Sequence, residues 1–120
     1  MQKVVILGAS PKPGRFAFKA LTKLKQAGHE IYPVHPKAEE IDGIAVYSSL
    51  TKIKDQIDTL TLYVGPARMQ DMTDQVCALK PKRVIFNPGT ESDEIQKQFE
   101  QAGIECICDC TLIMLDQNRF

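Results

Sequence analysis

Short apolar runs alternate along the whole chain with longer segments whose apolar residues recur every three or four positions. The runs predict strands at residues 3–7, 30–34, 44–47, 59–64, 83–86 and 104–108. The amphipathic segments predict helices at 14–26, 66–79 and 92–102. Ser48 or Ser49 is a suitable cap for a brief helix ending near residue 54, and the tail at 111–120 fits a short helical turn.

Regular alternation of strand and helix, with strands that are apolar throughout, is typical of a parallel sheet covered on both faces. Right-handed crossovers leave few topologies for such a chain. We expect one α/β, Rossmann-like, three-layer domain over residues 1–120, with a mostly parallel sheet in the strand order 3-2-1-4-5-6. In this architecture ligands bind beyond the carboxyl ends of the strands, here between the strands at 3–7 and 59–64.

The loop after the first strand has the composition of an anion site. Glycine here lets the backbone approach a ligand, and the helix that follows directs its free N–H groups at the same space. The loop departs from the G-x-G-x-x-G pattern, because Ser10 replaces the second glycine and the last glycine falls one residue late. Lys12 and Arg15 add positive charge. The residues that we assign to the site are Gly8, Ala9, Ser10, Lys12, Pro13, Gly14, Arg15 and Phe16.

Three further loops reach the same edge of the predicted sheet. The second strand ends in His35, Pro36 and Lys37, where NAD-binding domains usually place an acidic residue for the ribose. A cation there favours a phosphate on or near the ribose, as in NADP or coenzyme A, although Lys37 as a solvated loop lysine and His35 as an incidental residue are the alternatives. The other two loops supply the candidates Val64, Gly65, Pro66, Asn87, Pro88 and Gly89.

Composition narrows the functional class. The chain has 15 basic and 15 acidic residues, and this zero net charge argues against a nucleic-acid binder. It shows no secretory leader and no apolar run long enough for a membrane span, so we expect a cytoplasmic protein without membrane contact. The four cysteines, Cys77, Cys106, Cys108 and Cys110, lack the usual zinc-ligand spacing, which favours free thiols over metal or redox chemistry. No catalytic constellation is visible, which makes an enzyme the less favoured reading.

Taken together, the loops at 8–16, 28–37, 64–66 and 87–89 resemble those of the small stand-alone CoA-binding proteins. The domain of that family is similar to the N-terminal domain of the succinyl-CoA synthetase alpha subunit. The resemblance implies that the 8–15 loop holds the CoA diphosphate and that Lys37 faces the 3′-phosphate. It also implies that 64–66 line the adenine or pantetheine path and that 87–89 lie towards the pantetheine arm. The chain departs from the family at His35, where many relatives have Asn, and in the loop at 87–90.

The sequence therefore predicts non-catalytic binding of coenzyme A or an acyl-CoA. Its two histidines, His29 and His35, lie in the wrong region for the phosphohistidine that the synthetase carries in a second domain. Two alternatives stay open. In the first, the chain is an NAD(P)-binding sensor or enzyme domain. In the second, it is a scaffold or partner subunit that binds another protein and whose nucleotide pocket is vestigial.

Overall fold

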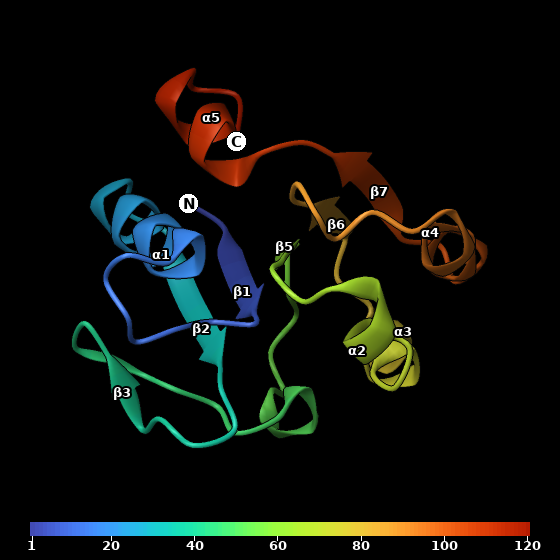
Figure 1. The fold of residues 1–120 in the computed structure, drawn as a ribbon, viewed down its shortest axis with the longest axis horizontal. Coiled ribbons are helices and arrows are strands. Elements are labelled where there is room, and N and C mark those ends of the chain that lie inside the picture. The colour runs from blue at the N-terminus through green and yellow to red at the C-terminus, as the bar shows by residue number, and fades with distance from the viewer.

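A five-stranded parallel sheet forms the centre of the molecule in the computed structural model, which describes residues 1–120. The strands are β1 (Lys3–Leu7), β2 (Glu30–Val34), β5 (Thr59–Leu62), β6 (Arg83–Phe86) and β7 (Glu105–Cys108), in the order β2-β1-β5-β6-β7. Figure 1 shows the sheet with helices on both faces. The predicted α/β class and parallel sheet are confirmed.

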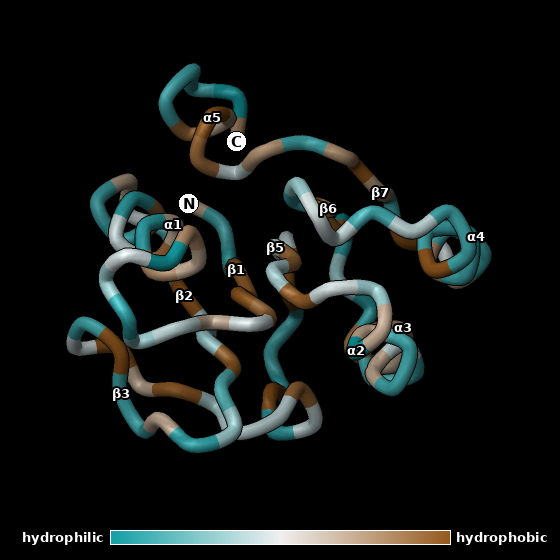
Figure 2. The backbone as a smooth tube through the Cα atoms, in the orientation of Figure 1, coloured by the Kyte–Doolittle hydropathy of each residue, from teal (hydrophilic) through white to brown (hydrophobic).

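The central strands β1, β5 and β6 bury both of their faces, because consecutive side chains point to opposite sides of the sheet. In β1, Val4 and Ile6 belong to one apolar cluster, whereas Val5 and Leu7 belong to the other. All four are at most 2% exposed. Figure 2 shows hydrophobic colour along β1, whereas much of α4 is hydrophilic. Two cores separated by one sheet give the three-layer arrangement that the sequence predicts.

The helices divide between the two faces. Helix α1 (Phe16–Gln26) covers the smaller core with Ala17, Leu21 and Leu24, and α5 (Thr111–Asp116) packs beside it. Helices α2 (Pro66–Met69), α3 (Thr73–Leu79) and α4 (Asp93–Gln101) cover the larger core on the opposite face. None of these helices is both long and apolar enough to span a bilayer.

The strand predicted at 44–47 was wrong in extent. A two-residue strand, β4 (Ile44–Ala45), pairs antiparallel with β3 (Glu40–Ile41) in a separate hairpin. Only Tyr47 reaches the main sheet, through a single parallel bridge to Val34 at the end of β2. The predicted order 3-2-1-4-5-6 is therefore correct for five strands and is corrected at the third, which stays outside the sheet.

The helix predicted at 66–79 is broken in two. Between α2 and α3 the backbone tightens, since Asp71 N–H donates to Arg68 O and Met72 N–H donates to Met69 O. These three-residue spacings are those of a 3₁₀ turn. Met69 and Val76 are buried against the sheet on the two sides of the break, and Met72, at the break, lies towards the carboxyl ends of the strands. The brief helix near residue 50 is a 3₁₀ turn, η1 (Leu50–Lys52), which Ser49 caps through Thr51 N–H.

Candidate functional site

Two adjoining cavities lie at the carboxyl ends of β1 and β5, the position that the sequence predicts for a ligand. The larger cavity, of about 730 Å³, is lined by the loops after β1, β5 and β6 and by the start of α1. The smaller, of about 420 Å³, extends towards the end of β2 and the η1 turn. Gly8, His35, Tyr63 and Arg68 line both cavities, so the two form one groove.

Gly8 sits at the tightest point of the groove. Its φ of +89° is one that side chains disfavour, and a Cβ there would lie 2.8 Å from Val64 Cγ2. The loop then folds back, as Ser10 Oγ accepts the Lys12 N–H at 3.1 Å and Arg15 N–H donates to Lys12 O at 3.0 Å. This geometry keeps the base of the groove open.

The larger cavity is electropositive. Lys12, Arg15 and Arg68 line it, and no acidic side chain lines either cavity. None of the three cations takes part in the ion pairs of the structure. No side chain caps the start of α1, so the first N–H groups of this eleven-residue helix also face outwards uncapped. Unpaired cations at a helix start are suited to an anionic group.

The smaller cavity has more apolar residues in its walls. Val34, Pro36, Leu50, Val64 and Met72 contribute to its walls. His35 is fixed at its entrance, because its Nδ1 accepts the N–H groups of Lys37 (3.0 Å) and Ala38 (2.9 Å). In the neutral imidazole the proton then resides on Nε2, which is left as a hydrogen-bond donor. A slot with apolar walls and a few polar groups at its ends is suited to a flat heterocycle.

Most of the sequence-predicted residues meet in this groove, and several do not. The residues that line it are Gly8, Ala9, Ser10, Lys12, Arg15, Phe16, His35, Pro36, Val64, Gly65, Pro88 and Gly89. Pro13, Gly14, Pro66 and Asn87 line neither cavity. Lys37 lines a third hollow of about 400 Å³, together with Lys52 and Glu39, and this hollow shares Pro36 and Ser48 with the smaller cavity. Lys37 is therefore beside the groove, not inside it.

Asn87 is a buried anchor beneath the groove. It is 2% exposed, and its amide donates to Thr61 Oγ1 and Leu62 O, both at 2.8 Å. Its Oδ1 accepts the Thr111 N–H at 2.9 Å, and its carbonyl accepts the Thr90 hydroxyl at 2.7 Å. With every polar atom of its side chain bonded, Asn87 fixes the 88–90 loop and the start of α5 relative to β5.

Sequence reasoning missed part of the lining. Tyr63 lies across the junction of the two cavities, and burial raises its pKa to about 12. Arg68, Met72 and Gln75 come from α2, the turn after it and α3. The positive charge of Arg68 is a sequence signal for an anion site. Met72 has the spacing of a core residue in a single helix, and only the break between α2 and α3 shows that it lines the groove. The remaining additions are Leu7, Ala17, Val34, Ser48, Ser49 and Leu50. Pro11 and Thr90, like Arg68, lie in the loops that the sequence predicts at this edge, although they were not assigned to the site.

The cysteines lie away from this groove. All four are free, and none lines either cavity. Cys106 and Cys108 both approach Gln96 of α4, whereas Cys110 leaves the strand and precedes α5. Burial raises the pKa of the Cys106 thiol to about 12, which leaves it unreactive as a nucleophile.

Comparison with known proteins agrees with the fold. Residues 2–116 match the family described as a CoA binding domain. The chain is 31% identical, over 99% of its length, to the alpha subunit of an ADP-forming acetate–CoA ligase from Pyrococcus furiosus, of which it spans 28%. It spans 14% and 9% of two further ADP-forming acetate–CoA ligases, from Archaeoglobus fulgidus and Methanocaldococcus jannaschii.

Solved structures match over almost the full chain. The crystal structure of an uncharacterized protein is 40% identical, with a TM-score of 0.88, covering 100% of this chain and 98% of that one. A structure from Thermus thermophilus is 29% identical, with a TM-score of 0.91, covering 99% and 90% of the two chains.

Proposed function

Because this chain belongs to the CoA binding domain family, we propose that it binds coenzyme A or an acyl-CoA in the groove and catalyses no reaction by itself. The observation that carries the proposal is a groove with three unpaired cations and no acidic side chain, directly after β1. A ligand with a diphosphate and a heterocyclic base matches its electropositive and apolar halves.

The electropositive larger cavity and the apolar smaller cavity determine which way round the ligand lies in the groove. The diphosphate lies in the larger cavity against the 8–15 loop. Arg15, directly before α1, and Arg68, in α2, face it from two different elements. The adenosine lies in the smaller cavity, and its 3′-phosphate is directed towards Lys37 and Lys52 in the adjoining hollow. The pantetheine arm runs past Pro88 and Gly89 and leaves near the exposed ring of Phe16.

The absence of catalysis is proposed from the side chains in the groove. Ser10, a candidate nucleophile in the glycine loop, accepts a backbone N–H and has no basic side chain as a partner. His35 has one ring nitrogen occupied by two backbone donors. A nucleophile needs an adjacent base in hydrogen-bond reach, and this pairing is missing.

A protein partner is a second part of the proposal. The P. furiosus relative is named as the alpha subunit of a ligase, and this chain corresponds to about a quarter of it. We propose that the chain presents a bound CoA thiol to a partner. NADP, the weaker alternative ligand, gains no support from the family match.

Thermal unfolding tests the proposal, with coenzyme A, 3′-dephospho-CoA, NAD and NADP each at about 1 mM. A ligand at about 100 times its Kd adds about 2.7 kcal/mol, which shifts the Tm of a domain of this size by several degrees. We expect the largest shift with coenzyme A and a smaller one with dephospho-CoA. No shift with either CoA species, or a larger one with NADP, overturns the proposal.

Arg68→Ala examines the groove in the same assay. It removes a charge-assisted contact worth about 1.5–3 kcal/mol, so the Kd for coenzyme A should rise roughly 10- to 100-fold. Lys97→Ala, on the exposed side of α4, is the control and should leave the Kd unchanged. Equal affinity of Arg68→Ala and the wild type would remove Arg68 from the site.

A further inference from the structure

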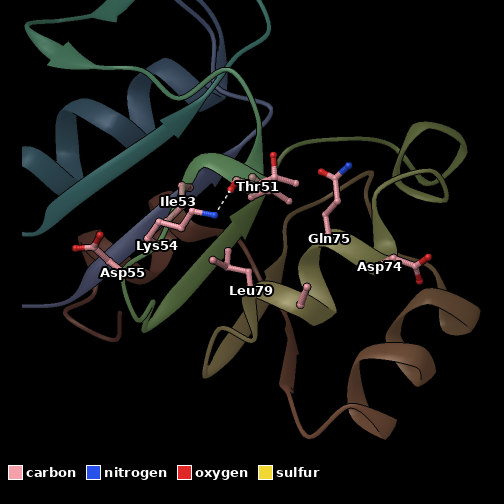
Figure 3. A pocket seen from close by; sticks show the side chains of 9 residues that line it. Thr51, Ile53, Lys54, Asp55, Asp74, Gln75 and Leu79 are labelled. Atoms are coloured by element: carbon pink, nitrogen blue, oxygen red, sulfur yellow. Dashed lines mark hydrogen bonds between the residues drawn. The ribbon is translucent and has the colours of Figure 1, made fainter.

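The side chain of Gln75 forms one end of the smaller cavity. Gln75 projects from α3 and lines both the smaller cavity of the groove and a neighbouring cavity of about 520 Å³ between η1 and α3. Figure 3 shows its amide extending clear of the helix, and the one hydrogen bond among the residues drawn there joins Lys54 to Thr51. Gln75 is a half-buried residue at the cavity wall, and none of the hydrogen bonds drawn in Figure 3 involves its amide.

We propose that Gln75 recognises the adenine ring of the ligand by pairing with its hydrogen-bonding edge, and thereby sets the base specificity of the site. The inference rests on the proposed function, since it assumes that the nucleotide end occupies the smaller cavity. An amide presents a donor and an acceptor side by side, and adenine presents N6–H next to a ring nitrogen acceptor. The two patterns are complementary, and the pair forms two parallel hydrogen bonds.

The other polar groups of the smaller cavity are less suited to this role. The Ser49 hydroxyl caps η1, accepting the Thr51 N–H at 3.2 Å and contacting Thr51 Oγ1 at 2.9 Å. His35 and Arg68 lie at the junction with the larger cavity, beside the position of the diphosphate. Ser48 is exposed on the side shared with the hollow that Lys37, Glu39 and Lys52 line, where the 3′-phosphate is directed. Gln75 is the one carboxamide in the lining.

The neighbouring cavity gives Gln75 a second effect, because Gln75 and Leu50 stand between the two spaces. Leu50 is 2% exposed and anchored in the larger core, so it is a fixed part of this wall. Gln75 is the movable part. Shortening the Gln75 side chain joins the smaller cavity to the neighbouring cavity and makes room for a base with an added ring.

Binding of coenzyme A and of 1,N6-etheno-CoA, which blocks N1 and removes the N6–H donor that an amide needs on either edge of adenine, tests this inference. For the wild type we expect coenzyme A to bind about 10-fold more tightly than the etheno analogue, the value of one to two neutral hydrogen bonds. In Gln75→Ala the ratio of the two Kd values should fall to about one, through weaker coenzyme A binding and easier entry of the etheno base. Gln75→Leu keeps the bulk without the amide and should weaken coenzyme A by a similar factor while still excluding the analogue.

Gln70→Ala is the matched control, since this glutamine lies at the end of α2, is exposed and lines no part of the groove. The Gln70→Ala variant should keep the wild-type ratio of the two Kd values. Wild-type protein that binds both ligands equally, or a Gln75→Ala variant with unchanged coenzyme A affinity, overturns the inference and leaves the proposed function standing. Failure of the wild type to bind coenzyme A at all is the separate outcome that overturns the proposed function.

Discussion

Gly8 is the residue on which the groove depends most directly. Its positive φ and its closeness to Val64 and the Tyr63 backbone leave no room for a side chain. We expect Gly8→Ala to lower the free energy of unfolding by about 1–3 kcal/mol through strain and contact, and to abolish ligand binding. Urea unfolding and the thermal-shift assay measure the two effects.

Gly14 provides the matched control in the same loop. A Cβ at Gly14 meets nothing within 4 Å, and its φ lies outside the positive range. Gly14→Ala should therefore keep both stability and binding. Similar losses in both variants would contradict the role assigned to Gly8, because general stiffening of the loop would then explain them.

His29 makes stability depend on pH near neutrality. Burial, the amino terminus and Arg83 lower its pKa below the usual 6.5, and its Nδ1 accepts the Gln2 N–H at 3.0 Å. The folded state therefore favours the neutral ring, so this contribution is present above the unfolded pKa of 6.5 and is lost as the pH falls through the lowered folded value. Urea midpoints should decline between about pH 7.5 and pH 5.

Comparison with His29→Gln isolates the contribution of this group. The variant should show a shallower decline over the same pH interval. An identical decline in the two proteins would assign the pH dependence to other residues.

At the scale of the elements, Asn87 connects three of them: β5 through Thr61 and Leu62, the 88–90 loop through Thr90, and α5 through Thr111. Removal of its amide leaves buried partners without hydrogen bonds, at about 1–3 kcal/mol for each unsatisfied group. We expect Asn87→Ala to destabilise the fold by about 2–4 kcal/mol and to weaken ligand binding, because the start of the 88–90 loop loses its side-chain links to β5 and α5.

Denaturant unfolding measures the first effect and titration with coenzyme A the second. Gln101→Ala, at the exposed end of α4, is the control. Asn87→Ala with wild-type stability would contradict the anchoring role.

The elements also show which parts of the fold were readable from sequence. The strand at 3–7 and the glycine after it were predicted because a continuous apolar run followed by Gly8 has one common structural meaning. The hairpin β3–β4 was missed, although Asp42 and Gly43 both have positive φ and form a two-residue turn between Ile41 and Ile44. Asp-Gly between apolar residues is a hairpin signal, so this error was avoidable.

The break between α2 and α3 was not readable in the same way. No proline or glycine lies within residues 67–79, and helical spacing continues across the break. Met69 and Val76, seven residues apart, would share one face of an unbroken helix and are buried on the two sides of the turn, so the spacing of apolar residues gives no sign of the turn. Met72 and Gln75 enter the groove as a consequence of packing, so their roles depend on contacts distant in sequence.

For the whole molecule, the groove combines segments that start near residues 8, 35, 48, 63 and 88. A parallel sheet gathers the ends of its strands at one edge, and this rule is why the four predicted loops meet. The rule does not determine which side chain faces the ligand. The Asn87 side chain is buried beneath the groove and Lys37 lies beside it, although both residues follow strands whose positions were predicted correctly.

The unpaired cations of the groove affect how quickly a ligand arrives as well as how firmly it is held. At the opposite end of the sheet Lys3 and Lys82 are neutralised by Asp55 and Asp58, so a molecule of zero net charge still projects a positive field from one end. Such a field steers anions over about 10 Å at 0.1 M salt. Stopped-flow mixing with coenzyme A should give an association rate constant that falls severalfold as salt rises from about 50 to 500 mM, with a dissociation rate that changes much less. An association rate independent of salt would contradict this expectation. A falling one would mean that ionic strength sets the speed of capture for a protein that carries no overall charge.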